Sequence, residues 1–217
     1  MKMNIVLLIV LAGLNFIAID ARAASLVDGD AKSGEAKSAP CSACHGAEGN
    51  SMSPIWPNLA GQAAPYIVAQ LKAFKSDPNN PDAKALRSDP LMTPQAMMLS
   101  DQDINDLAVY YESLPVGAQA VADPDLISRG EALWRAGNSE EGVAACAACH
   151  GPTGRGNPAA SYPLLAGQHS AYIAKQLNDY AAGKRRSDGK TRIMRDISER
   201  LNQEDITALA SYVQGLK

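Results

Sequence analysis

Two five-residue runs, CSACH at residues 41–45 and CAACH at residues 146–150, decide how this chain of 217 residues folds. The pattern Cys-Xaa-Xaa-Cys-His is the attachment site of a c-type haem. Each cysteine thiol adds to one vinyl group of the porphyrin, and the histidine that follows binds the iron as proximal ligand. The two runs use all four cysteines, so we predict two covalently bound haems c and, as function, the movement of electrons. The predicted attachment residues are Cys41, Cys44, Cys146 and Cys149, and the predicted proximal ligands are His45 and His150.

Two other interpretations of a Cys-Xaa-Xaa-Cys pair are a zinc site and a redox-active dithiol. A redox dithiol does not require a histidine directly after the second cysteine. A zinc site built from both runs would have to join positions that lie 105 residues apart. Neither alternative accounts for a duplicated Cys-Xaa-Xaa-Cys-His, so haem attachment is the favoured interpretation.

The sequence around each run is repeated, with a period of about 100 residues. WPNLAGQ at 56–62 returns as YPLLAGQ at 162–168, and the segment 99–114 returns as 201–216. A period of this length indicates duplication of a whole domain rather than a solenoid. The segment between the copies, PVGAQAVADPD at 115–125, has the small residues and bounding prolines of a linker. We predict one domain at 24–115, a linker at 116–125 and a second domain at 126–217.

Both copies show helical patterns. Ser100 with Asp103, and Asn202 with Asp205, have the spacing of a helix N-terminal capping box. Apolar residues then recur three and four positions apart in both copies. A further pair of helices is expected at 65–75 and 171–182, and no segment shows the sustained alternation of a strand. The predicted fold class is all-α, with two tandem domains that are each wrapped around one covalently attached haem.

The first 23 residues have the pattern of an export signal. Lys2 supplies a positive start, residues 5–19 are mostly apolar, and Ala21-Arg22-Ala23 has the small-x-small form that a signal peptidase cuts. The apolar run is short for a membrane span, which needs about 20 residues. We predict a cleavable signal peptide at 1–23, and an uncleaved anchor is the alternative.

Charge is divided unevenly between the two copies. Residues 24–117 hold 6 basic and 11 acidic side chains, a net charge of −5, whereas residues 118–217 hold 12 and 11, a net charge of +1. Such polarity favours different partners at the two ends, because the field of a protein steers its encounters. Nothing in the composition indicates a nucleic-acid partner. The aromatic content of only 5% fits small cores that are completed by a porphyrin.

Methionines are the favoured candidates for the sixth ligand of each iron. Met92 and Met194 stand seven residues before Leu99 and Leu201, which are equivalent positions of the repeat. A thioether favours ferrous iron and raises the reduction potential. It also closes the sixth position, which suits electron transfer, whereas catalysis needs an open site. The methionines without a methionine counterpart in the second copy are Met52, Met97 and Met98.

Pro57 and Pro163 follow the proximal histidines by 12 and 13 residues. A proline offers a carbonyl without an amide hydrogen. That carbonyl could accept a hydrogen bond from the histidine Nδ1–H and so orient the ligand from outside the coordination shell. The alternative is an ordinary turn proline.

One histidine and several arginines remain. His169 has an alanine as counterpart in the first copy, and we expect it to be a solvent-facing loop residue rather than a haem ligand. Four arginines are candidates for pairing with haem propionates, with solvated surface charge as the alternative. They are Arg87, Arg185, Arg186 and Arg192.

Together these motifs resemble the cytochromes c4, dihaem proteins built from two class I cytochrome c domains. The match includes the paired CxxCHG runs, the two LAGQ motifs, RSDPLM at 87–92 and RIMR at 192–195, and it covers essentially the whole chain after the signal. The resemblance implies two all-α, cytochrome c-like domains facing each other. It implies His/Met ligation through His45 and Met92 and through His150 and Met194. It also implies a bacterial periplasmic carrier, monomeric and at most peripheral to the membrane, that passes electrons from quinol-oxidising complexes toward a terminal oxidase.

Two alternatives to a free carrier stay open. The first is a dihaem enzyme, such as a peroxidase or a thiosulfate dehydrogenase, which would need an open or unusually ligated haem. The paired methionines and the lack of a fifth cysteine argue against it, so we predict that the chain is not an enzyme. The second alternative is an electron-transfer subunit of a larger dehydrogenase or oxidase, which the sequence does not separate from a free carrier.

Overall fold

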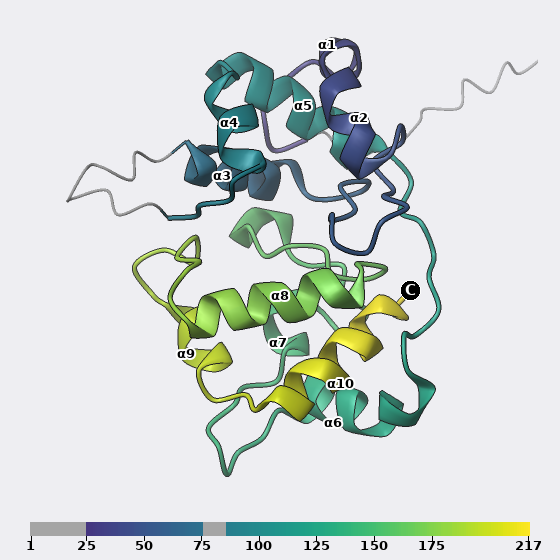
Figure 1. Ribbon diagram of the computed structural model, residues 1–217, viewed down its shortest axis with the longest axis vertical. Coiled ribbons are helices and arrows are strands. Elements are labelled where there is room, and N and C mark those ends of the chain that lie inside the picture. Colours follow the sequence, from purple (N-terminus) through teal and green to yellow (C-terminus); the bar gives the residue numbers. More distant parts are fainter. Residues whose placement is uncertain (1–24, 76–85) are drawn as a thin grey trace, which may run out of the picture.

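A computed structural model describes residues 25–75 and 86–217, so the predicted signal peptide at 1–23 lies outside the described residues. Two helical domains are stacked on each other and joined by a linker that runs along one side (Figure 1). The first domain contains α1 (Ala31–Lys37), α2 (Ala39–His45), α3 (Ala64–Phe74), α4 (Met92–Met97) and α5 (Asp101–Ser113). The second contains α6 (Ile127–Ala136), α7 (Ala147–His150), α8 (Ser170–Ala181), α9 (Ile193–Ser198) and α10 (Gln203–Gln214), with short 3-10 helices η1 (Pro124–Leu126) and η2 (Pro158–Ala160).

The expected helices are confirmed. Both capping boxes form, since the Ser100 and Asn202 side chains accept hydrogen bonds from the backbone N–H of Asp103 and Asp205. The helices expected at 65–75 and 171–182 each begin and end one residue earlier, as α3 and α8. Within the described ranges β-structure is limited to isolated bridges, and no helix there is long and apolar enough to cross a bilayer. The all-α class is therefore correct.

Each domain is closed by a tight crossing of its first and last helices, α1 on α5 and α6 on α10. Gly34 and Gly130 lie at these crossings. A Cβ atom at Gly34 would clash with the Asp106 carbonyl oxygen, and one at Gly130 would clash with the Ala208 carbonyl oxygen. Because nothing larger than glycine fits there, these two residues set the distance between the helices.

The core of each domain is small and includes the first cysteine of its haem run. In the first domain Cys41 packs against a cluster built mainly from α3 and α5. In the second, Cys146 packs against an equivalent cluster from α6, α8 and α10. The buried members of the two clusters are Ala64, Ile67, Leu107, Ala108 and Tyr111, and Leu133, Trp134, Ile173, Leu209, Ala210, Tyr212 and Val213.

Two equivalent glutamines hold the domains together through a reciprocal pair of backbone contacts. The Gln62 side chain donates to the Leu164 carbonyl and accepts from the Leu164 N–H, both at 2.9 Å. The Gln168 side chain does the same with Asn58 of the first domain, also at 2.9 Å. Asn58 and Leu164 are themselves equivalent in the repeat. The interface therefore has an approximate two-fold axis that the sequence repeat alone did not predict.

His169 lies in this interface, which corrects the expectation of a solvent-facing loop residue. It is only 7% exposed, and its Nε2 lies 3.0 Å from the Ser51 carbonyl of the first domain. A carbonyl can only accept, so Nε2 carries a proton and the ring joins the two domains. The loop before His169 packs against the first domain, and local sequence does not reveal this long-range contact.

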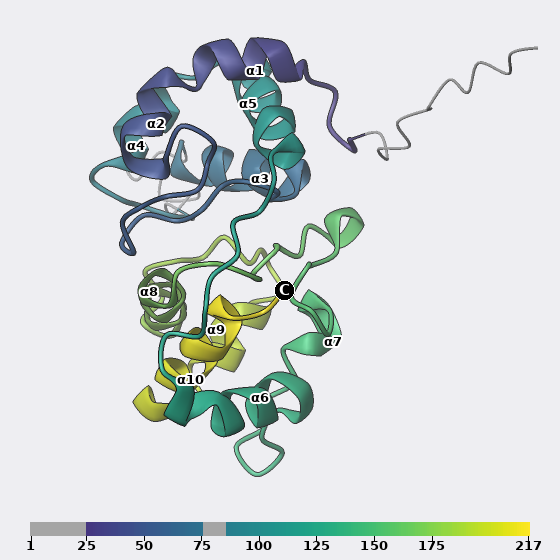
Figure 2. The ribbon, with the colours of Figure 1, turned by 90° about the vertical axis from the view of Figure 1, so that its right-hand side faces the viewer.

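The linker is fixed to both domains along its length (Figure 2). Gly117 N–H donates to the Asn50 side chain at 2.8 Å, and the Gln119 side chain donates to the Gly167 carbonyl at 2.7 Å. Farther along, Asp123 N–H donates to the Ser211 hydroxyl at 2.7 Å. These bonds and the glutamine contacts hold the two domains in one relative orientation.

Two candidate haem sites

The four cysteines lie within or directly before the short helices α2 and α7, and none of them forms a disulfide in the described part of the chain. Residues three apart on a helix share a face, so the two thiols of each run point to the same side. Burial raises the pKa of the Cys41 thiol, and it raises the pKa of the Cys146 thiol to about 11. A raised thiol pKa argues against a redox-active dithiol, which depends on a lowered thiol pKa.

Both proximal histidines are buried and held by a proline carbonyl. His45 Nδ1 lies 2.8 Å from the Pro57 oxygen, and His150 Nδ1 lies 3.2 Å from the Pro163 oxygen. Because a carbonyl only accepts, each Nδ1 carries the proton and each Nε2 keeps a free lone pair. Burial lowers the pKa of both rings, more than the hydrogen bond to the proline raises it. Both imidazoles are thus neutral, in the tautomer that binds a metal through Nε2.

Met92 and Met194 take corresponding positions in the two domains. Met92 begins α4, which packs on α3, and Met194 is the second residue of α9, which packs on α8. Both side chains are half-buried. The remaining methionines of the described residues are strongly exposed, namely Met52 at 96%, Met97 at 60% and Met98 at 85%.

The four arginines suggested for propionate binding lie in different environments. Arg192 is exposed and forms ion pairs with Asp196 and Glu199, so it belongs to the solvated surface. Arg186 is half-buried and donates to the Gly183 carbonyl. Arg87 and Arg185 lie between the domains, and Arg185 is only 4% exposed. The surface alternative is therefore wrong for Arg185.

The donor set of each domain fits one haem c. It consists of two thiols on one helical face, a neutral imidazole with a free Nε2 and a half-buried thioether on a separate short helix. Within residues 25–75 and 86–217, no three His, Cys, Asp or Glu side chains gather closely enough to hold another metal ion. The zinc alternative therefore finds no support in the described part of the chain.

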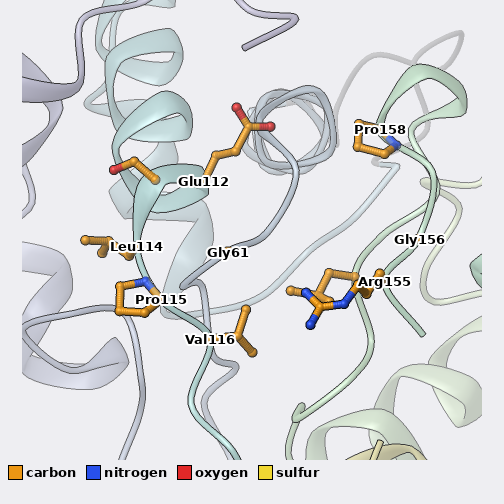
Figure 3. Close-up of a pocket in the computed structure, with 10 residues that line it drawn as sticks. Gly61, Glu112, Leu114, Pro115, Val116, Arg155, Gly156 and Pro158 are labelled. Carbon is orange, nitrogen blue, oxygen red and sulfur yellow. The ribbon is translucent and has the colours of Figure 1, made fainter. Parts of the chain in front are cut away.

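A cavity of about 650 Å³ lies between the domains on the linker side. Figure 3 shows Glu112 of the first domain and Arg155 of the second on its walls, with Pro115 and Val116, where the first domain meets the linker, below Glu112. The cavity is lined by none of the cysteines, histidines or methionines assigned to the haems. It is therefore a feature of the domain interface, separate from the two candidate haem sites.

Comparison with known proteins gives matches in both halves of the chain. The cytochrome c family model matches twice, at residues 31–115 and 127–217. Cytochrome c4 from Stutzerimonas stutzeri is 46% identical over 87% of this chain and 90% of its own length. The crystal structure of reduced recombinant cytochrome c4 from Pseudomonas stutzeri superposes with a TM-score of 0.82, covering 87% of this chain and 100% of that one. A thiosulfate dehydrogenase electron acceptor from Stutzerimonas stutzeri (strain A1501) is 35% identical over 79% of this chain and 76% of its own length.

Proposed function

Because the chain belongs to the cytochrome c family and, within it, to the dihaem cytochromes c4, we propose that it carries electrons in the periplasm from quinol-oxidising complexes toward a terminal oxidase. Membership makes it an electron-transfer cytochrome with two covalent haems c, one for each CxxCH run. The proposal adds the compartment, the two partner classes and the roles of individual residues.

In the proposed site of the first domain, Cys41 and Cys44 would hold the porphyrin, and His45 and Met92 would ligate the iron. In the second, Cys146 and Cys149 would hold the porphyrin, and His150 and Met194 would ligate the iron. Each bound haem supplies one iron that alternates between the ferrous and ferric states. The Pro57 and Pro163 carbonyls fix the tautomer and the ring orientation of the histidines. A rigid, preorganised ligand set lowers the structural change that accompanies loss or gain of an electron.

The observation that carries the proposal is the duplication of one set of candidate haem ligands. The only half-buried methionines among the described residues occupy corresponding places in both domains. Each proximal histidine contacts the carbonyl of the equivalent proline in its own domain. An enzyme such as a peroxidase needs one iron with an open position, and therefore two unlike sites. Two like sites, each with a methionine available for the sixth position, suit the uptake and release of single electrons.

The test is electron delivery in membranes that contain the quinol-oxidising complex and the oxidase but lack soluble cytochromes. Adding the haem-loaded protein should restore quinol-dependent oxygen uptake, which cyanide should stop. The haems should be reduced within seconds of quinol addition, and an inhibitor of the quinol-oxidising complex should prevent their reduction. Uptake that stays at the level without the protein would contradict the proposed partners.

A second donor class is favoured by one comparison. The relative from Stutzerimonas stutzeri (strain A1501) is named as the electron acceptor of a thiosulfate dehydrogenase. We propose a thiosulfate-oxidising enzyme as an alternative donor to the same carrier. Mixing the oxidised protein with such an enzyme and thiosulfate, without membranes, should then reduce both haems. Thiosulfate with the cytochrome alone should leave the haems oxidised, because the carrier itself is not the enzyme.

A further inference from the structure

One buried hydroxyl group in the second domain has no hydrogen-bond partner. It belongs to Ser198, the last residue of α9, whose side chain is fully buried. Within residues 25–75 and 86–217, its Oγ is the one buried side-chain oxygen or nitrogen that makes no hydrogen bond. The other buried serines of the described residues all donate to a backbone carbonyl at 2.7 to 3.0 Å, and they are Ser38, Ser51 and Ser211.

The Ser198 hydroxyl is not explained by packing. A buried hydroxyl without a partner gives up its hydrogen bonds to water and gains none in return, so such groups are rare in folded proteins. A serine in a helix ordinarily donates to the carbonyl four residues earlier, here that of Met194, but this bond does not form. The first domain has Ala96 at the equivalent position, and it is just as deeply buried. An alanine therefore fills this place in the fold without the cost of the hydroxyl.

Ser198 lies one helical turn from Met194, the proposed iron ligand of the second domain. The two residues are four positions apart on α9, so they share one face of the helix, with Cβ atoms about 5–6 Å apart. Helical side chains lean toward the N-terminus of their helix, which directs the Ser198 hydroxyl over the turn that carries Met194. Met194 is the second residue of α9, so no earlier turn of the helix restricts its long, flexible side chain.

The two side chains match as donor and acceptor. A hydroxyl carries one O–H donor, and a thioether sulfur is a weak acceptor. A sulfur that gives one lone pair to iron keeps a second lone pair, which can accept a hydrogen bond. Met194 is half-buried, and α9 packs on α8, whose Ile173 lies in the same core as Cys146. The unpartnered hydroxyl is thus on the helix that closes the candidate haem site of the second domain.

We propose that the Ser198 hydroxyl donates a hydrogen bond to the Met194 sulfur when this sulfur ligates the iron, and that it thereby raises the reduction potential of the second haem. Ser198 is then a positioning residue, because it acts on the iron through Met194 and is not itself a ligand. The inference rests on the proposed ligand set of the second domain, but not on the proposed electron donor or acceptor.

The direction of the effect follows from the O–H dipole. Its positive end points at the sulfur and at the iron behind it. Ferric iron carries one more positive charge than ferrous iron, so this dipole disfavours the ferric state. The hydrogen bond also withdraws electron density from the sulfur and weakens its donation to the iron, which has the same sign. In the first domain Ala96 supplies no such dipole, so the first haem lacks this contribution.

The experiment exchanges the two residues in the intact, haem-loaded protein and measures both reduction potentials. In Ser198→Ala the ferrous-to-ferric ratio of the second haem at a fixed applied potential should fall about threefold. This corresponds to ~28 mV, since a tenfold change is ~59 mV for one electron. Ala96→Ser places a hydroxyl one turn from Met92, and the first haem should shift by a similar amount in the opposite direction. Ser198→Ala should fold normally, because the first domain tolerates alanine there.

A second readout separates the hydrogen bond from a general change in the domain. Ferric haem with a thioether ligand has a weak far-red charge-transfer band, whose energy depends on the bond between sulfur and iron. In Ser198→Ala the band of the second haem should shift, and the band of the first haem should stay in place. Met194→Ala should abolish the band of the second haem and so identifies it.

The matched control is Ser211→Ala, which removes another buried hydroxyl of the second domain, one that is bonded to the backbone of Asp123. It should leave both potentials and both bands in place. The proposal alone is overturned if the native protein shows the band of the second haem but Ser198→Ala changes neither this band nor the potential. A native protein without that band would overturn the ligation by Met194, and this inference with it.

Discussion

The two domains share one plan, and they differ most clearly where the first and last helices cross. In the first domain Lys37 and Asp106 form an ion pair of 2.7 Å at the crossing of α1 and α5. At the equivalent positions the second domain has Leu133 and Ala208, which are buried apolar residues. The second domain places its ion pair elsewhere along the crossing, between Arg129 of α6 and the buried Asp205 of α10 at 2.7 Å, so each domain has a charge pair there but at a different position.

The outer surfaces also differ. Large apolar side chains that are strongly exposed are concentrated in the first domain, including Met97 and Met98 at the end of α4. Their equivalents in the second domain are Glu199 and Arg200. The first domain is also the acidic one, with a net charge of −5 over residues 24–117 against +1 over 118–217. Duplication has kept the candidate haem ligands and the interface contacts alike, while the outer surfaces have diverged.

The largest expected effect tests what the domains share. Gly34→Ala and Gly130→Ala would each place a Cβ atom against a backbone carbonyl at a helix crossing. Overpacking of this kind costs about 3 kcal/mol, and both variants should destabilise their own domain by a similar amount. Denaturant unfolding of the haem-loaded protein measures this, with the exposed Glu35→Ala as control. Helix propensity alone would raise the free energy of unfolding by about 1 kcal/mol, and such a rise in either variant would refute the close helix crossing.

A smaller effect tests the symmetry of the interface. Gln62→Ala and Gln168→Ala each remove two interdomain hydrogen bonds and leave backbone groups at Leu164 or Asn58 without their partner. Each variant should lose about 1–3 kcal/mol of unfolding free energy. The two domains should then unfold in distinct steps, because fewer bonds couple them. The exposed Gln203→Ala serves as control. Unequal losses of stability in the two variants would show that the two glutamine contacts are alike in geometry but not in energy.

The smallest expected effect concerns pH, and it should be larger in the first domain, because Asp106 has an alanine, Ala208, as its counterpart in the second. The Asp30 N–H is the main cause that lowers the pKa of Asp106, and Lys37 and Gln102 add to it. A carboxylate with a lowered pKa stabilises the fold fully above its ordinary value of 3.8, and this stabilisation is lost as pH falls through the folded-state pKa. We expect the first domain to unfold before the second as pH drops below about 4.

The matched variant is Asp106→Asn, which keeps an acceptor for the Asp30 N–H but loses the charge that faces Lys37. It should be less stable at neutral pH and less sensitive to acid, as followed by circular dichroism and by the haem absorbance. If the second domain unfolds first in acid, the contrast between the two helix crossings does not control acid stability.

Much of this architecture is local in origin and could be predicted from the sequence. The CxxCH runs, the capping boxes at Ser100 and Asn202 and the two central helices depend on neighbouring residues, so their patterns identify them directly. The prolines at Pro57 and Pro163 stood out because their distance from the histidines repeats. A repeat of this kind exposes features that both domains need.

The interface could not be predicted in the same way. Gln62 and Gln168 repeat in the sequence, but a repeated glutamine does not show whether it contacts its own domain or the other. His169 has no histidine counterpart in the first domain, and Ser51, whose carbonyl it contacts, lies 118 positions away in the chain. Arg185 was open to two interpretations because its burial depends on the partner domain. Such contacts are fixed by the packing of two separately folded units.

The most direct test of two closed, six-coordinate haems is the visible spectrum of the dithionite-reduced, haem-loaded protein before and after addition of carbon monoxide. The native protein should show no change, whereas Met92→Ala and Met194→Ala should each bind carbon monoxide at one haem of the two. A shift in the native spectrum that amounts to one haem would contradict the account. It would show that one iron is open and would give the enzyme hypothesis precedence over the carrier.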